Sequence, residues 1–348
     1  MTRRFLGAAC AAAAIGALAP SVAGAATHTV FVGGDQVVKT APPNFSPNAF
    51  LRRTVTVHVG DTVSWRFRGF HTVTFPVKGK QPPPFEVPTP TPVSGAIDGA
   101  GRPFWFNGQL PQLAVNPVAA APAKGSAYTG ARFRNSGLPA TPPKAYSLKF
   151  TKAGTFDYYC AIHTGMEGRV KVLSSKKRIP TEAQNRAAAT AELNRLVAQA
   201  KSAAAKPTAA GTVDIGRGPS GTRFTINSFF PNNPTVKVGG TLTFTMAGQN
   251  PTEIHTATLG PLTREQVPFI GPTGAINAVA AYPSDPPTAF PPYTGINHGN
   301  GFLNLGLEDN RPASPLPNTG AITFNAAGTF QLKCLVHAGM DATVTVTP

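Results

Sequence analysis

The feature of this chain that most restricts its fold is a seven-residue pattern that occurs twice. Residues 160–166 read CAIHTGM and residues 334–340 read CLVHAGM, so both copies have the form Cys-x-x-His-x-x-Met. The sequence of 348 residues contains only 3 cysteines, 4 methionines and 7 histidines. Apart from Cys10, every cysteine belongs to this pattern, which indicates that the two copies share one local structure and one chemical purpose.

The repeat extends to both sides of this pattern and divides the chain into two similar halves. In each half two stretches of alternating apolar and polar residues turn at a glycine, as hairpins with one buried face do. The matching stretches are 54–67 with 234–246, and 146–160 with 320–334. Short strands rich in Val, Thr and Phe, separated by glycine and proline, predict an all-β protein of two tandem β-sandwiches.

We expect the two halves at residues 26–175 and 212–348, with long insertions at 76–141 and 260–318. Both insertions are rich in proline, alanine and glycine. Both carry YTG followed by Asn-x-Gly-Leu, which predicts that they are ordered and homologous. The apolar segment PFWFNG (103–108) is predicted to form the small core of its own insertion, and a hydrophobic docking surface near the site is the alternative.

Residues 176–211 are predicted to form a helical linker. Thr181 and Gln184 have the spacing of a capping box, and Pro207 ends the helical run. Apolar residues recur at helical spacing, namely Leu193, Leu196, Val197 and Ala200. Such a helix either acts as a semi-rigid spacer or packs across both halves, and the sequence leaves both alternatives open.

Residues 1–25 read as an export signal peptide. Arg3 and Arg4 precede an apolar run, and Ala23-Gly24-Ala25 offers a small-residue cleavage site. The arginine pair resembles a twin-arginine signal that lacks the usual residue between the arginines. Lipid attachment at Cys10 is the less favoured alternative. We therefore expect an exported protein, in the periplasm, at the cell surface or secreted, and no later segment is apolar enough to span a bilayer.

The formal net charge of +16 limits the choice of partners. Through long-range steering it favours anionic polymers of the cell wall or an acidic redox partner protein. The basic residues are scattered along the chain, so a merely soluble surface is an alternative explanation of the charge. Export argues against nucleic acid as a partner, and the sequence leaves the oligomeric state open.

A histidine on a β-rich stretch precedes the cysteine pattern in each half, His71 in GFHTVTF and His255 in EIHTATL. Two imidazoles and a thiolate, with a thioether as a weak fourth ligand, are the ligand set of a blue-copper electron-transfer centre. Exported proteins often use cysteines in disulfides, and a bridge between Cys160 and Cys334 is the alternative. That alternative leaves the neighbouring histidines and methionines unexplained.

With these residues the chain resembles the cupredoxins, and its short ligand loop is most similar to that of amicyanin, beside plastocyanin and halocyanin-like proteins. The resemblance implies two Greek-key β-sandwiches with one type 1 copper ion each, and it covers neither the helix nor the insertions. The implied ligands are His71, Cys160, His163 and Met166 at the first centre, and His255, Cys334, His337 and Met340 at the second. The chain departs from the family at Thr72 and Thr256, where many members have an asparagine that ties the ligand loops together.

The ligand set implies a one-electron carrier rather than an enzyme. Two-domain copper oxidases and nitrite reductases need a second kind of copper centre, usually built from His-x-His pairs, and a histidine beside the blue-copper cysteine. The sequence contains no His-x-His, and no histidine flanks either cysteine. The remaining histidines, His28, His58 and His298, are given no role. Two alternatives stay open: copper buffering or delivery outside the cytoplasm, and an interaction module in which the metal only stabilises the fold.

Overall fold

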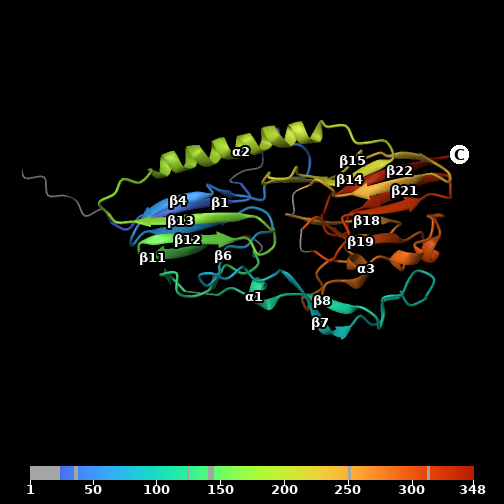
Figure 1. Ribbon diagram of the computed structural model, residues 1–348, viewed down its shortest axis with the longest axis horizontal. Coiled ribbons are helices and arrows are strands. Elements are labelled where there is room, and N and C mark those ends of the chain that lie inside the picture. The colour runs from blue at the N-terminus through green and yellow to red at the C-terminus, as the bar shows by residue number, and fades with distance from the viewer. Residues whose placement is uncertain (1–23, 35–37, 124, 140–144, 250–251, 312–313) are drawn as a thin grey trace, which may run out of the picture.

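Two β-sandwiches lie end to end in a computed structural model of the chain, and one long helix runs along both of them (Figure 1). The structure describes residues 24–34, 38–123, 125–139, 145–249, 252–311 and 314–348. The predicted export signal lies outside these residues except for its last two. No helix among them is long and apolar enough to cross a membrane. The predicted all-β fold with two tandem sandwiches and a helix between them is confirmed.

The first half consists of two five-stranded sheets, in the orders β3-β1-β5-β11-β9 and β10-β6-β12-β13-β4. The strands of the first sheet are β1 (Thr27–Val32), β3 (Phe50–Leu51), β5 (Thr62–Phe67), β9 (Ala127–Tyr128) and β11 (Tyr146–Phe150). Those of the second are β4 (Thr54–His58), β6 (Thr74–Phe75), β10 (Arg134–Asn135), β12 (Gly154–Tyr159) and β13 (Glu167–Leu173). Alternate residues face inward, and Trp65 is fully buried at the centre of this core.

The second half repeats this topology, in the orders β2-β15-β14-β17-β20 and β16-β22-β21-β18-β19. Its first sheet contains β14 (Thr212–Arg217), β15 (Thr225–Phe230), β17 (Thr241–Thr245) and β20 (Thr319–Thr323). The second contains β16 (Thr235–Lys237), β18 (Ile254–Leu259), β19 (Leu303–Asp309), β21 (Gly328–Lys333) and β22 (Asp341–Thr347). The edge strand β2 (Phe45–Ser46) comes from the first half and pairs with β15, so the two halves interlock.

The linker helix α2 (Glu182–Ala204) begins at the predicted capping box of Thr181 and Gln184. The helix runs along both halves (Figure 1), and its apolar residues belong to a cluster that contains residues of both halves. From the helix the cluster includes Leu193, Leu196 and Ala200, from the first half Phe31 and Leu51, and from the second half Phe224 and Ile226. Of the two alternatives left open by the sequence, the structure therefore shows packing across both halves.

The two insertions share one structural feature. Each contains one short helix, α1 (Pro117–Ala120) or α3 (Ala278–Ala281), held by a buried asparagine. The Asn135 amide donates to the carbonyls of Val118, Ala119 and Ala121, and its oxygen accepts from Thr74. Asn304 makes the equivalent bonds to Val279, Ala280, Tyr282 and Thr258. The remaining insertion elements are β7 (Glu86–Pro92), β8 (Pro111–Val115), η1 (Pro287–Ala289) and η2 (Asn297–Gly299).

The aromatic segment PFWFNG fastens the first insertion to the second half of the molecule. Phe104 and Phe106 share an apolar cluster with residues of the second half, namely Val267, Ala278, Ala280, Phe302 and Leu335. The Trp105 indole donates to the carbonyl of Pro283 at 2.8 Å. The prediction that this segment forms the core of its own insertion is therefore confirmed only in part, because residues of the second half share that core. The same cluster includes Val93 of the first insertion, with Leu110 packed against it, so the segment belongs to a core shared by its own insertion and the second half.

Asp61 ties the N-terminal strand to the turn between β4 and β5. Its carboxylate accepts the backbone N–H groups of Ala26 and His58, both at 2.8 Å, and lies 3.0 Å from the His28 imidazole. Burial opposes ionisation of Asp61, but the hydrogen bonds from Ala26, His58 and His28 outweigh it and keep its pKa below the ordinary value. His28, to which the sequence assigned no role, therefore helps to hold the N-terminal strand against this turn through its contact with Asp61.

We expect Asp61→Asn to lower the free energy of unfolding by about 2–4 kcal/mol at neutral pH, because a buried, charge-assisted network is lost. Since the folded pKa of Asp61 is depressed, its contribution is present above an unfolded pKa of about 4 and is lost as the pH falls through the folded value. Urea unfolding at neutral and acidic pH measures this difference. The control Asp157→Asn removes an exposed pair with Arg169 and should change stability by less than about 1 kcal/mol. An equal loss for Asp61→Asn at both pH values would contradict the expectation.

Candidate metal centres

Each candidate centre is assembled from an upstream histidine and the Cys-x-x-His-x-x-Met loop of the same sandwich. His71 lies just before β6 and His255 lies in β18, whereas the cysteine follows β12 or β21 directly. The backbone N–H of Cys160 donates to the carbonyl of Met166, and that of Met166 donates to the carbonyl of His163. Cys334, His337 and Met340 repeat these bonds. The Cys-x-x-His-x-x-Met sequence therefore folds into a closed loop that holds its side chains in one place.

The histidines and cysteine of each half converge, with their ligand atoms within 4.8 Å of one another. At the first centre the Nδ1 atoms of His71 and His163 are 2.9 Å apart, and the Cys160 Sγ is 3.4 Å from His163 Nδ1. At the second centre the two Nδ1 atoms are 3.1 Å apart, and Sγ lies 3.7 and 3.8 Å from them. Met166 and Met340 are buried in the same apolar clusters as their cysteines. Both cysteines are free, so the disulfide alternative is wrong.

The chemistry of these donors fits a copper ion. An ion that binds nitrogen at about 2.0 Å and thiolate sulfur at about 2.3 Å reaches three atoms with this spacing. Two imidazoles and one thiolate, buried with a thioether in the same cluster, are the donors of a blue-copper site. In both halves the Nδ1 atoms of the two histidines face each other and the thiol, so they are the nitrogen atoms that such an ion would take.

The surroundings of both thiols favour the thiolate that copper requires. Burial opposes ionisation of Cys160, but the charge of His163 and the hydrogen bonds from His163 and His71 hold its pKa well below the ordinary value. Cys334 is also buried, and its hydrogen bonds with His255 and His337 lower its pKa in the same way. Both sulfur atoms are therefore prepared as metal ligands.

Thr72 and Thr256, where the chain departs from the family pattern, tie the two ligand loops together. The backbone N–H of Thr72 donates to the Cys160 sulfur at 3.4 Å, and its hydroxyl accepts from the N–H of Ala161 at 2.8 Å. Thr256 makes the same two bonds with Cys334 and Leu335. Threonine therefore connects the ligand residues by hydrogen bonds in both halves.

Two glycines that sequence reasoning missed make room for the upstream histidines. Gly33 has φ +73°, and a Cβ there would lie 2.6 Å from Nε2 of His71. Gly216 has φ +76°, and a Cβ there would lie 2.7 Å from Nε2 of His255. Any side chain would collide with the imidazole and strain the backbone. Gly33 and Gly216 occupy equivalent positions in the two halves, and this equivalence is the sequence feature that could have identified them.

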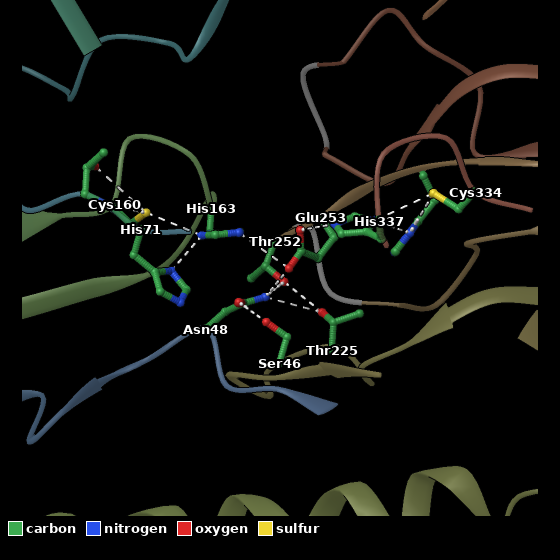
Figure 2. A network of polar contacts seen from close by, with 12 residues as sticks. Ser46, Asn48, His71, Cys160, His163, Thr225, Thr252, Glu253, Cys334 and His337 are labelled. Atoms are coloured by element: carbon green, nitrogen blue, oxygen red, sulfur yellow. Dashed lines mark hydrogen bonds and ion pairs between the residues drawn. The ribbon is translucent and has the colours of Figure 1, made fainter. Parts of the chain in front are cut away.

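Sequence reasoning also missed Glu253, which lies between the two centres (Figure 2). Its carboxylate is 3.5 Å from Nε2 of His163 and 3.2 Å from Nε2 of His337. Burial raises its pKa, but the charges of these histidines and the hydrogen bond with His337 outweigh burial and lower it below the ordinary value. When the two halves are aligned, Glu253 stands opposite Gly69, two residues before the ligand histidine. This difference between the halves is the sequence feature that could have identified Glu253.

Both centres border one cavity of about 400 Å³ between the two halves. His71, His163 and His337 line it together with Glu253, and its apolar wall includes Phe70, Phe85, Ile162 and Val336. The Glu86–Arg311 ion pair, which joins the first insertion to the second half, also lines this cavity. The two candidate centres therefore face each other rather than pointing to opposite ends of the molecule.

The structure thus combines two β-sandwiches with one His-Cys-His cluster in each half. Similar solved structures include a reduced amicyanin variant, at 22% identity over 42% of this chain and 82% of that chain, with TM-score 0.20. Others are plastocyanin from Dryopteris crassirhizoma (18%, covering 39% and 99%, TM-score 0.20) and auracyanin from Roseiflexus castenholzii (17%, covering 39% and 95%, TM-score 0.24). No family model and no curated protein matches the chain.

Proposed function

We propose that the protein binds two copper ions, one in each half, and acts as an exported one-electron carrier. The observation that carries this proposal is the duplicated cluster itself. Two buried thiolates, each with two converging imidazoles, occupy equivalent positions in two sandwiches of the same topology. Because both the ligand residues and the sandwich that holds them are repeated, we infer that each half binds its own metal ion and that the function uses both.

The residues of the chain would hold the metal in a fixed environment. The histidine and cysteine of each loop, with the upstream histidine, would be the strong ligands, and Met166 or Met340 the weak one. Bound copper would supply reversible one-electron chemistry. The Thr72 and Thr256 N–H groups stabilise the thiolate charge, and the two sandwiches fix both ligand loops. Ligands that do not move on oxidation or reduction favour fast electron exchange.

Copper buffering and enzymatic turnover have less support. Buffering proteins benefit from mobile ligands, whereas these are buried in a sheet framework. A second kind of copper centre would need further histidines. In the described part of the chain His28 pairs with Asp61, His58 contacts the Lys177 carbonyl, and His298 bridges Asp98 and Asp285. An interaction module would need free surface on the insertions, and apolar residues of both insertions are instead buried in the cluster that joins the halves.

The predicted export signal supports an extracytoplasmic role. The formal net charge of +16, or +14 without Arg3 and Arg4 of that signal, supports an acidic redox partner protein. The test of the proposed function is an optical and EPR redox titration of copper-loaded protein with metal counting. We expect intense blue absorption, about two copper ions per chain and reversible titration of both. Slow, irreversible redox with easy copper exchange would favour buffering, and turnover of nitrite or oxygen would favour an enzyme.

A further inference from the structure

Glu253 contacts one ligand histidine from each half, and it does so at the same ring atom. In both imidazoles Nδ1 faces its own centre, so the Nε2 atoms of His163 and His337 point outward toward each other. One Glu253 oxygen is 3.5 Å from the first Nε2 and the other is 3.2 Å from the second (Figure 2). Along this route the ligands of the two centres are separated by two non-covalent contacts, one from Glu253 to His163 and one from Glu253 to His337.

The position of Glu253 is fixed by residues of both halves. Asn48, fully buried and from the first half, donates to Glu253 Oε1 at 2.8 Å. The same amide lies 3.1 Å from the hydroxyl of Thr252 in the second half, and Ser46 donates to the Asn48 oxygen. A carboxylate clamped in this way cannot turn from one imidazole to the other, so both contacts exist at once.

The bridge does not follow from the duplication, because only the second half has a carboxylate at this position. The first half has Gly69 there, as GFH stands opposite EIH in the repeat. One acidic residue thus serves two centres. A purely stabilising role explains this poorly, because burying a carboxylate with imidazoles brings little net stability once desolvation is subtracted.

We propose that Glu253 couples the two centres into one electron-exchanging unit, an inference that rests on the proposed copper function. It accepts the Nε2–H of His337 and pairs with Nε2 of His163 across 3.5 Å, which keeps each Nδ1 free for the metal and fixes both rings. It also completes a continuous path between the ligand shells. One electron leaves the reduced centre and reduces the oxidised one, and no atom is transferred. The chain then works as a carrier whose two centres equilibrate internally rather than as two independent carriers.

The test uses the full copper-loaded chain with Met340→Gln as a background, because a changed axial ligand gives the second centre a different potential and spectrum. After partial reduction by a radiolytic pulse, the electron redistributes between the centres at a rate independent of protein concentration. We expect Glu253→Gln to slow this step about 10-fold or more and to raise both midpoint potentials, since a negative charge near both ions is lost. Glu86→Gln, in the same cavity but paired with Arg311, is the matched control and should change neither.

A measurement without redox chemistry or any variant tests the same geometry. In zinc-loaded protein, ¹⁵N NMR should show Nε2 of both His163 and His337 protonated and protected from exchange by the carboxylate. Unprotected Nε2–H groups, or an unchanged transfer rate and potentials in Glu253→Gln, would overturn the coupling while the blue absorption remained. If the proposed copper function itself were wrong, the result would be different, because the unsubstituted chain would bind no copper or show no blue band.

Discussion

Replacing Cys160 by serine is expected to remove about half of the blue absorption of the copper-loaded protein, and replacing Cys334 to remove the other half. The intense band of such a centre arises from the bond between copper and thiolate. Serine is nearly the same size, but its hydroxyl does not ionise in this environment and is a poor ligand for copper. Each variant should therefore bind about one copper ion tightly instead of two, measured by optical spectroscopy and metal analysis.

The folding of these variants provides the control. Both cysteines are free and buried, so no covalent link is lost, and the metal-free variants should keep the near-ultraviolet circular dichroism of the parent chain. The double variant should be colourless. If one substitution alone abolished the whole band, the two centres would not be self-sufficient, and the assignment of one complete ligand set to each half would be wrong.

The duplicated pattern made the candidate centres predictable from the sequence. The cysteine, the second histidine and the methionine of each centre lie within seven residues, so their proximity is a local property of one loop. The upstream histidines were found because a repeat shows which positions keep their chemistry in both copies. The tandem sandwiches were also predictable, because the alternation of apolar and polar residues is a local property of each strand and occurs in both halves.

Contacts between the halves were not predictable in this way. Glu253 meets His163 and His337 only after both sandwiches have folded and docked, and no periodicity encodes that distance. The pairing of β2 with β15 and the burial of PFWFNG against the second half are also contacts between segments far apart in the chain. The helix α2 was predictable as a helix from its capping box, but the surfaces that it covers depend on how the halves are arranged.

The second large effect, on the free energy of unfolding, is expected from Phe106→Ala, which removes a side chain from the contact between the halves. Phe106 is fully buried, stacks on Phe104 with ring centroids 5.2 Å apart, and lies in the cluster that joins the first insertion to the second half. Removing a ring from such a site costs the transfer free energy of the ring and leaves a cavity. The free energy of unfolding should fall by about 3–5 kcal/mol.

The two tryptophans of the chain allow the site of the damage to be located. Trp105 belongs to the same interface segment, whereas Trp65 lies in the first core. Urea unfolding followed by fluorescence, in Trp65→Phe and Trp105→Phe backgrounds, reports each region separately. We expect Phe106→Ala to shift the Trp105 transition to lower urea more than the Trp65 transition, because the interface loosens before the first sandwich unfolds. Val118→Ala, an exposed change in the same insertion, should alter stability by less than about 0.5 kcal/mol. Equal shifts at both tryptophans would mean that the halves unfold as one cooperative unit in which this interface has no separate stability.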